Sequence, residues 1–597
     1  MRPRMLLRGV VASAAVATIA AGAASAAAPE WGQWGQNPQH TGRTAAAGQA
    51  AMRLLADIVY DPFVQQEKSD PASPGDLLVH YQAPLVSGAD VFMEFKSGRF
   101  TGIPTWETQT WGERRLHWRG SALVNAWSFA SDWKPVPYGT GLSGPSWEPV
   151  FHAALSGRFV YVPGAGGSVY KLNQANGAVA AHVRPFGAAG NPAPDPDLFV
   201  AGALTVDAHG NVYYNAIQLV HGQAWLADVR GSWLVVVRPD GSSSTVPYSA
   251  LTAGAPAGGD LCAGTFADSQ LPWPPSPDAA APQVPCGSQR AALNLAPAVA
   301  PDGTIYTASV AQFTSRTAYL IAVNPDLSPR WAASLRDRLT DGCNGTIPPT
   351  GGPGGCRAGA RDGVDPAENR PGAGLILDES SASPVVAPDG SILFGTSTRY
   401  NYAQGHLMKF APDGSFLAAY PFGWDTTPAI YLHGGTYSIV LKDNQYGGLG
   451  SYCDDGSACP SDRTANNPAS PEAYFIAQLS PDLTVEWRWQ NTNPLSCARA
   501  ASGPPSCVAD HPAGFEWCAN AVAVDRLGVV YANSEDGNLY AIRQGGTLRD
   551  HLFLDLAIGA AYTPFAIGGD GKLYTQNDGH LFVVGRCVPR RNGRGCR

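Results

Sequence analysis

Four acidic residues, each located just before the first strand of a repeat, are the first candidates for chemistry. They are Glu148, Glu379, Asp425 and Glu516, and three have an indole neighbour, Trp147, Trp424 or Trp517. Carboxylates beside indoles can bind a cation, a sugar or a basic peptide. Each residue also has a structural interpretation, in which the acid caps a turn and the tryptophan fills a channel. The sequence leaves both interpretations open.

No familiar motif assigns a reaction to these acids. The chain has no Gly-x-Ser-x-Gly elbow, Walker loop, His-Glu-x-x-His motif or EF-hand loop, and its twelve His are scattered without ligand spacing. We therefore predict no catalytic residue and no metal site.

The segments that must position the acids form a repeat. The phrase Ala296-Pro-Ala-Val-Ala-Pro-Asp-Gly-Thr-Ile-Tyr306 returns as Ser383-Pro-Val-Val-Ala-Pro-Asp-Gly-Ser-Ile-Leu393. Looser copies begin at Pro84, Pro149, Ala203, Pro428, Ala521 and Pro564. Each copy reads as a strand, a tight turn and a second strand, and the shortest spacing matches one four-stranded blade. The sequence predicts an all-β fold, an eight-bladed β-propeller of four-stranded antiparallel blades.

The ends of the repeat array indicate how the ring closes. The last repeat, 564–585, has room for three strands, and the apolar segment 52–60 can supply the fourth. A ring closed by both ends of the chain leaves no open sheet edge. Seven blades is the alternative, if the weak first repeat at 84–96 is not a blade. We expect a signal peptide at 1–26, the propeller at 27–585 and a tail at 586–597.

The segment Trp31-Gly-Gln-Trp-Gly-Gln-Asn-Pro-Gln-His-Thr-Gly42-Arg43 and the repeat Ser534-Glu-Asp-Gly-Asn-Leu-Tyr-Ala-Ile542 resemble PQQ-like (quinoprotein-like) propellers. So does Gly167-Ser-Val-Tyr-Lys-Leu172. The resemblance implies either a quinone-dependent dehydrogenase or a cofactor-free scaffold. In a dehydrogenase, PQQ and Ca²⁺ would lie over the channel near the four acids. The chain lacks the adjacent Cys pair and the Cys-x-x-Cys-His haem motif of such enzymes, so we expect no cofactor.

The N-terminus predicts export. Arg2, Arg4 and Arg8 precede a small apolar run at 9–28, with Ala24-Ser25-Ala26 as the cleavage site. A transmembrane anchor is the alternative, but the run is rich in Ala and Gly. We expect a secreted protein, extracellular or periplasmic, that does not span the membrane. The net charge of −8 argues against nucleic acid as a partner, and we expect a monomer.

Eleven cysteines agree with an oxidising compartment. Ten fall in five close pairs: Cys262 with Cys286, Cys343 with Cys356, Cys453 with Cys459, Cys497 with Cys507, and Cys587 with Cys596. The remaining Cys518 could instead pair with Cys497 or Cys507. Zinc sites are the alternative, but the chain has no Cys-x-x-Cys. We expect disulfides.

The long insertions give the strongest functional hint. They are 97–111, 131–148, 185–200, 251–294, 339–383, 443–472 and 491–518. By strand counting, each joins the second strand of a blade to its third, or one blade to the next, so all should lie on one face with four of the five disulfides. Long loops on a rigid scaffold commonly bind partners, although one face could simply tolerate insertions. We predict a non-catalytic binding or scaffold protein with protein or glycan partners; the alternative is a PQQ-dependent dehydrogenase oxidising an alcohol or sugar.

Overall fold

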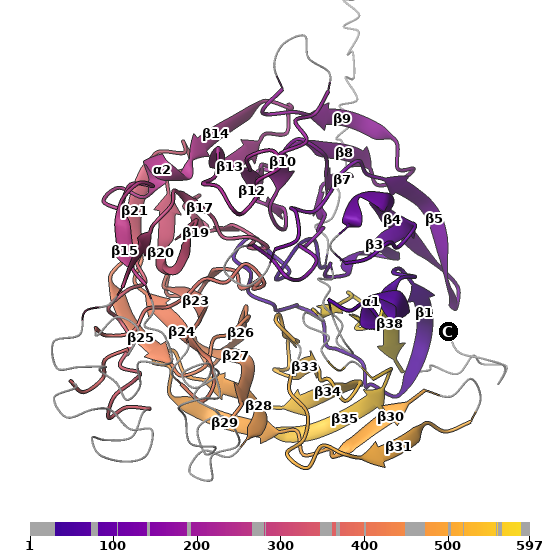
Figure 1. Ribbon diagram of the computed structural model, residues 1–597. Helices are drawn as coiled ribbons and strands as arrows, with labels where there is room; N and C mark the ends of the chain where they lie inside the picture. The colour runs from indigo at the N-terminus through magenta and orange to yellow at the C-terminus, as the bar shows by residue number, and fades with distance from the viewer. Residues whose placement is uncertain are drawn as a thin grey trace, which may run out of the picture.

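Short runs rich in Val, Ile, Tyr and Thr, separated by turns with Pro, Asp and Gly, build the sheets of this protein. The computed structural model arranges eight of these sheets in a ring, which confirms the predicted eight-bladed β-propeller (Figure 1). The structure describes residues 30–72, 82–103, 105–139, 144–187, 193–264, 280, 282–346, 361–365, 370–398, 401–447, 472–499, 503–517, 519–556, 558 and 564–586. The expected signal peptide and tail cysteines lie outside these ranges.

Within each blade the strands, here called A to D from the channel outward, pair antiparallel, and in all blades except blade 8 they follow chain order. Blade 1 consists of β2 (Leu85–Ser87), β3 (Asp90–Gly98), β4 (Gln109–Arg119) and β5 (Ala122–Ala130). Blade 2 consists of β6 (Ala154–Ser156), β7 (Phe159–Pro163), β8 (Val169–Asn173) and β9 (Val179–Val183). Blade 3 has a broken strand A, β10 (Leu198–Val200) with β11 (Thr205–Val206), then β12 (Val212–Gln218), β13 (Gly231–Val237) and β14 (Ser243–Pro247). Blade 4 likewise has β17 (Gln289–Ala291) with β18 (Ala298–Val299), then β19 (Ile305–Ala311), β20 (Thr314–Val323) and β21 (Pro329–Ser334).

The second half of the ring repeats the arrangement. Blade 5 consists of β22 (Val385–Val386), β23 (Ile392–Ser397), β24 (Gly405–Phe410) and β25 (Phe416–Tyr420). Blade 6 consists of β26 (Ala429–His433), β27 (Thr436–Gln445), β28 (Ala473–Leu479) and β29 (Val485–Gln490). Blade 7 consists of β32 (Ala523–Val524), β33 (Val530–Asn533), β34 (Asn538–Arg543) and β35 (Thr547–Phe553). Blade 8 consists of β36 (Ala566–Ile567), β37 (Leu573–Asn577), β38 (His580–Gly585) and, from the N-terminal side, β1 (Arg53–Val59).

Blade 8 closes the ring as the sequence predicts. Strand β1 pairs antiparallel with β38, from Arg53 opposite Gly585 to Val59 opposite His580. Segments from both ends of the chain therefore share one sheet, in which β1 covers the edge that β38 would otherwise leave unpaired.

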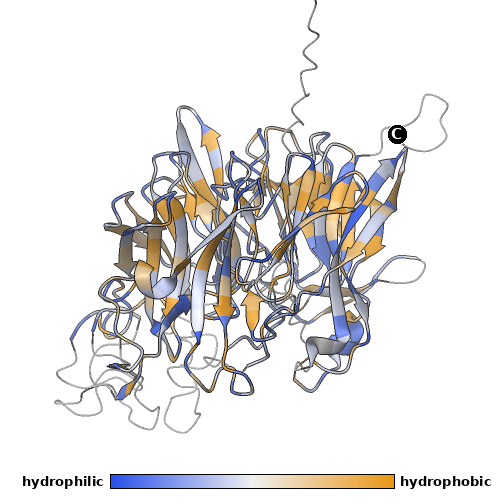
Figure 2. Ribbon diagram, turned by 90° about the horizontal axis from the view of Figure 1, so that it is seen from above, coloured by the Kyte–Doolittle hydropathy of each residue, from blue (hydrophilic) through white to orange (hydrophobic). Residues whose placement is uncertain are grey.

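The connections divide between two faces because the strands alternate in direction. The A–B and C–D turns form one face, here called the turn face. The B–C and D–A connections form the other, the loop face, which is the side facing the viewer in Figure 1 and the lower side in Figure 2. All seven long connections run between strand ends on the loop face, as predicted. The loop face also carries the remaining small elements: α1 (Val64–Lys68), the 3-10 turn Trp106–Thr108, α2 (Tyr248–Leu251), and the hairpins β15 (Leu261–Ala263) with β16 (Gln283–Pro285) and β30 (Leu495–Ala498) with β31 (Ser506–Ala509).

Tryptophans of the outer strands fasten neighbouring blades together. Trp331 of blade 4 donates from Nε1 to Pro412 O at 2.9 Å and lies against Gly414 in a turn of blade 5. A Cβ at Gly414 would come within 2.7 Å of the indole, and this glycine has φ of +86°. Only glycine suits both the backbone conformation and the contact. Trp127 of blade 1 lies against Gly177 of blade 2 in the same way. Both indoles therefore pack against the neighbouring blade.

The N-terminal segment 31–49, here called the head segment, runs around the inside of the ring and bonds to each blade in turn. Its contacts with the second residue of strand A are Trp31 with Val86, Gly32 with Leu155, Gln33 with Val206, Pro38 and Gln39 with Val299, Gln39 with Val386, Thr41 with Ile430, and Gly42 and Thr44 with Val524. Gln49 N then donates to Gly571 O of blade 8 at 2.8 Å. The head segment thereby satisfies inner-edge groups that the blades leave unpaired.

Candidate functional site

The channel is closed by a side chain of the head segment. Trp34 is buried among one small or branched residue from each of five blades: Ala83, Val150, Ala203, Ala296 and Ala521. Its Nε1 donates to Thr427 Oγ1 at 3.4 Å, and its ring meets His152 edge-on at 5.7 Å between centroids. A ligand entering from the loop face would therefore rest above an indole floor.

The predicted acids Glu379 and Asp425 lie close to this channel on its loop-face side. Glu379 Oε1 accepts from Ser146 Oγ at 3.0 Å, and Asp425 Oδ1 accepts from the Ser381 backbone N–H at 2.8 Å. Burial, and then the carboxylate of Asp378, raise the pKa of Glu379 to about 7. Burial also raises the pKa of Asp425 to about 6, although Lys442 lies 3.7 Å from its Oδ2. Both acids bond to residues of other connections, so they tie the channel wall together.

Trp147 and Trp424 directly precede Glu148 and Asp425, and Glu516 and Trp517 lie in the connection between blades 6 and 7. The Glu516 carbonyl accepts from Glu535 N at 3.1 Å, and Trp517 exchanges backbone bonds with the side chain of Asn444. Trp517 is fully buried against Trp489, whereas Trp147 and Trp424 are half-buried. The predicted residues thus make different contacts: Glu379 and Asp425 bond neighbouring connections, whereas Trp517 packs between Trp489 of blade 6 and Tyr540 of blade 7.

Glu148 belongs to a buried charged cluster at the joint between blades 1 and 2 that the sequence did not reveal. The Lys96 Nζ is held by Asp61 Oδ2 at 2.7 Å, Glu67 Oε1 at 2.9 Å and Glu148 Oε2 at 2.5 Å. Trp111 Nε1 donates to the other Glu148 oxygen at 2.7 Å. The three carboxylates come from the connection after β1 and from the segment before β6, so one ammonium ties blade 8, blade 1 and blade 2 together.

Two further glutamates, Glu94 and Glu113, face each other across β3 and β4 beside this cluster. Burial raises the pKa of Glu113 to about 8 and holds that of Glu94 well above its ordinary value. Burial, and then Asp61, raise the pKa of Glu67 to about 8. For Lys96, burial alone would lower the pKa, but the carboxylates together keep it well above the ordinary value. The raised pKa values favour the neutral form of Glu67 and Glu113 near neutral pH, which lowers the cost of burying them beside Lys96.

We expect this joint to make stability depend on pH. A carboxyl whose folded pKa is raised stabilises the protein below the unfolded pKa, near 4.5, and loses that contribution as pH rises through about 8. Glu113→Gln should therefore flatten the fall in melting temperature between pH 5 and pH 8.5 and raise apparent stability at the alkaline end by up to about 4 kcal/mol. Thermal unfolding across this range, with the exposed Glu486→Gln as control, measures it. Parallel pH profiles for Glu113→Gln and the wild type would contradict it.

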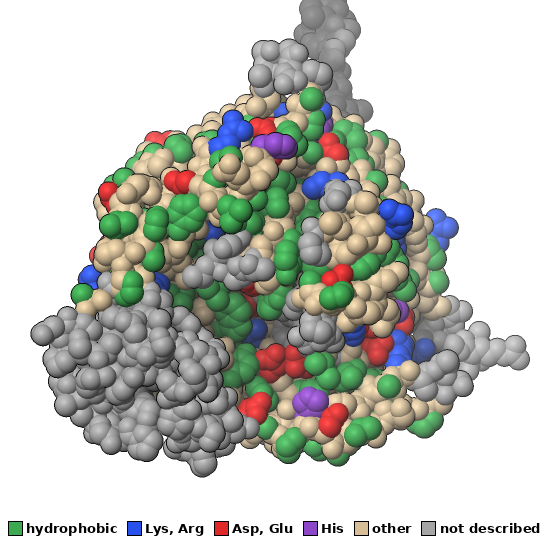
Figure 3. All heavy atoms as spheres, viewed as in Figure 1, with side chains coloured by type: hydrophobic (Ala, Val, Ile, Leu, Met, Phe, Trp, Pro, Cys, Tyr) green, Lys and Arg blue, Asp and Glu red, His purple; other side chains and the backbone are tan. Residues whose placement is uncertain are grey.

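The described disulfides lie on the loop face. Cys262–Cys286 joins the ends of the β15–β16 hairpin, and Cys497–Cys507 crosses β30–β31. Cys343, in the connection between blades 4 and 5, is also disulfide-bonded. The expected partners Cys356, Cys453 and Cys459, together with Cys518, Cys587 and Cys596, lie outside the described residues. Figure 3 shows this face hollowed near the middle of the ring.

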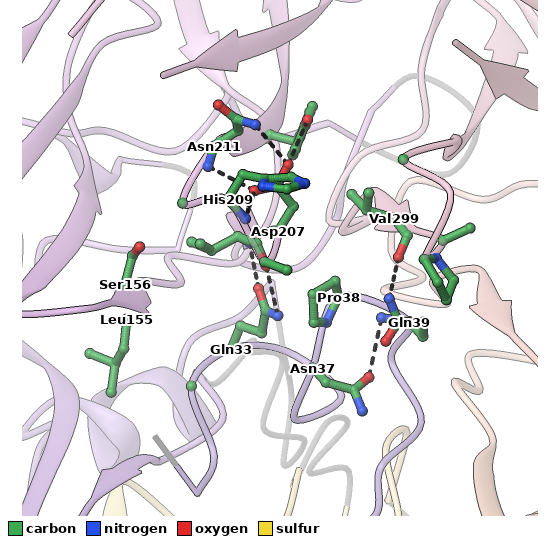
Figure 4. A pocket seen from close by; sticks show the side chains of 18 of the residues that line it. Gln33, Asn37, Pro38, Gln39, Leu155, Ser156, Asp207, His209, Asn211 and Val299 are labelled. Carbon is green, nitrogen blue, oxygen red and sulfur yellow. Dashed lines mark hydrogen bonds between the residues drawn. The ribbon is translucent and has the colours of Figure 1, made fainter. Parts of the chain in front are cut away.

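A cavity of about 890 Å³ opens on the turn face (Figure 4). The head segment and the A–B turns of blades 2, 3 and 4 line it. Its amides are engaged in attaching the head segment: Gln33 bonds both backbone groups of Val206, and Gln39 Nε2 donates to Val299 O at 2.6 Å. Asp207 caps its own turn by accepting from His209 N at 2.8 Å and Asn211 N at 2.9 Å. The polar groups of this cavity thus serve the fold.

The described residues do not supply a metal centre at the channel. No three His, Cys, Asp or Glu side chains in the described ranges are grouped so that they could hold a metal ion. The nearby guanidinium of Arg290 is fully engaged, since it bonds Asp378 through both Nη atoms at 2.8 and 2.7 Å. This guanidinium is therefore not free to pair with a carboxylate of a bound PQQ. Nor is any helix in the described ranges long and apolar enough to cross a membrane.

Comparison with known proteins finds distant similarity to solved structures and assigns no family. No family model matches the chain, and no curated sequence matches it significantly. Among solved structures it is similar to a europium-containing methanol dehydrogenase, with 10% identity, 92% of this chain and 89% of the other covered, and a TM-score of 0.49. A quinohemoprotein alcohol dehydrogenase from Comamonas testosteroni shows 12% identity, 94% and 81% coverage, and a TM-score of 0.48. BamB from Moraxella catarrhalis shows 10% identity, 89% and 99% coverage, and a TM-score of 0.37. At this identity and these TM-scores the similarities assign no function, which must be argued from the chain's own residues.

Proposed function

We propose that this protein is an exported, non-catalytic binding or scaffold protein that engages a protein partner through its loop face. The observation that carries the proposal is a pair of exposed aliphatic side chains on connections held rigidly at blades 3 and 4. Leu226 is 86% exposed and Leu261 is 64% exposed. Large apolar side chains held out from a rigid scaffold mark interaction surfaces when they lie together.

The two leucines belong to connections that are joined to each other. Asp228 accepts from the Ser288 backbone N–H at 2.8 Å and from its hydroxyl at 2.7 Å. The disulfide Cys262–Cys286 fixes the hairpin that carries Leu261. Little chain entropy is then lost when a partner covers these side chains. Because the exposed groups are aliphatic, they suit a protein surface better than a glycan. The disulfides agree with the oxidising compartment expected from the N-terminal sequence.

Photo-crosslinking tests the proposal. A crosslinker at position 226 or 261 should give discrete adducts in the exported fraction, whereas one at Leu432 or Leu527, exposed on the turn face, should give none. The identified partner, once purified, should bind at least about tenfold more weakly to a Leu226→Ser, Leu261→Ser double variant. The double variant Leu432→Ser, Leu527→Ser should bind like the wild type. Equal crosslinking from both faces would contradict the assignment.

Calorimetry with PQQ and Ca²⁺, followed by a dye-linked alcohol oxidation assay, tests the competing dehydrogenase. We expect neither heat of binding nor turnover, because the described channel residues are engaged with one another. Micromolar binding accompanied by turnover would overturn the scaffold assignment.

A further inference from the structure

The β30–β31 hairpin presents an open sheet edge at the rim of the loop face. It forms a separate two-stranded sheet, and all four residues of β31 are exposed, with Val508 at 65%. Figure 1 shows β31 as the outer strand of the hairpin, farther from the ring than β30. An exposed edge of this kind is a template for pairing with another strand.

The disulfide fixes which backbone groups this edge offers. Cys497 lies opposite Cys507 with 4.1 Å between their Cα atoms, the short spacing of a pair that exchanges no backbone hydrogen bonds. The N–H and C=O groups of Cys507 therefore point away from β30, and so do those of Ala509 two residues on. Neither N–H donates to any residue in the described ranges. The edge thus presents two hydrogen-bonding residues placed symmetrically about Val508.

We propose that β31 pairs antiparallel with β31 of a second copy of this chain, about a two-fold axis at Val508. In this register Cys507 of each copy exchanges hydrogen bonds with Ala509 of the other. The two Val508 residues face each other as the closely spaced pair, which brings their exposed side chains into contact. The result is a continuous four-stranded sheet across the two copies. The proposal replaces the monomer expected from the sequence and does not rest on the proposed function.

The charges at the two ends of the hairpin favour a second copy over an unrelated strand. The turn end carries Arg499, which bonds Asp57 at 2.9 Å, and the open end carries the exposed Asp510. Hydrogen bonds from Ser496 and then His511 hold the pKa of Asp510 below its ordinary value, so it is ionised at neutral pH. Antiparallel pairing brings the acidic end of one hairpin toward the basic end of the other. Asp510 then lies opposite Ser506, and no like charges are opposed.

Sedimentation equilibrium of the mature, oxidised chain over about 1 to 300 µM tests the proposal. One short strand pair buries less surface than a stable interface, so we expect a weak dimer that doubles the mass in the upper part of this range. Val508→Asp should place two carboxylates on the axis and weaken association at least tenfold. Val179→Asp, at another exposed strand position of 51% exposure, should leave it unchanged.

Each outcome decides the matter once melting curves show that both variants fold. A concentration-dependent dimer that Val508→Asp abolishes and Val179→Asp preserves supports pairing through β31. The mass of a single chain throughout the series overturns the proposal. A dimer that survives Val508→Asp also overturns it, because the copies then meet elsewhere.

Discussion

Lys96→Met should lower the apparent free energy of unfolding by about 3–5 kcal/mol, one of the two largest effects expected in this chain. The substitution leaves the carboxyls of Asp61, Glu67 and Glu148 buried without the ammonium that joins them. The deficit should be smaller at pH 5.5 than at pH 8.5, because protonation removes the uncompensated charge. Denaturant unfolding at both pH values measures the effect.

Lys572→Met is the control for this experiment. Lys572 pairs with Asp570, which is half exposed, and surface pairs of this kind contribute about 0–1 kcal/mol. A similar loss from both substitutions would show that the Lys96 cluster does not hold the three blades together. A Lys96→Met deficit independent of pH would show that uncompensated charge is not its cause.

Trp34→Ala should cost about 3–5 kcal/mol as well, because it leaves a cavity where inner-strand residues of five blades meet. The surrounding alanines are short and belong to separate blades, so they cannot close together to fill the space. Trp34→Phe should cost about 1–2 kcal/mol, because it keeps an aromatic filling and loses mainly the bond to Thr427.

Chemical denaturation of the two variants measures this difference. Equal losses from Phe and Ala at position 34 would mean that the indole hydrogen bond, rather than channel filling, is the contribution that matters. An unchanged midpoint for Trp34→Ala would show that the channel needs no plug.

The blades could be predicted because their signals are local. The Pro-Asp-Gly turn at 301–303, with an apolar strand on each side, encodes one hairpin regardless of the rest of the chain. The prediction that 52–60 completes the last blade depended only on counting strands, and β1 occupies Arg53–Val59. The first parts of strand A in blades 3 and 4, β10 and β17, were missed because they fall inside the predicted insertions 185–200 and 251–294, and three residues are too few to show a strand pattern.

The buried joint could not be predicted, because its members are distant in sequence and unusual in burial. Lys96 and Glu67 lie 29 residues apart, and their contact depends on how the closing segment folds over blade 1. Alternation of apolar and polar residues assigns charged side chains to the surface, yet Lys96, Glu94 and Glu113 are inside. Glu148 was predicted as a candidate ligand residue, and its partner Lys96 was not predicted. Gln33 and Gln39 could have indicated that the head segment bonds to the inner strands. A side-chain amide has both a donor and an acceptor, so it can pair with backbone groups as a neighbouring strand does.

The path of the head segment implies an order of assembly. It is synthesised before any blade, and it contacts the blades in the order in which they emerge. Each new inner strand from β2 onward therefore meets a hydrogen-bonding partner that has already been made. Completion nevertheless waits for the last strands, because β1 has no partner until β38 exists. A polypeptide stopped shortly before residue 580 would carry the head segment and seven blades, but β1 would lack its partner strand, and its edge would be open to pairing with another chain.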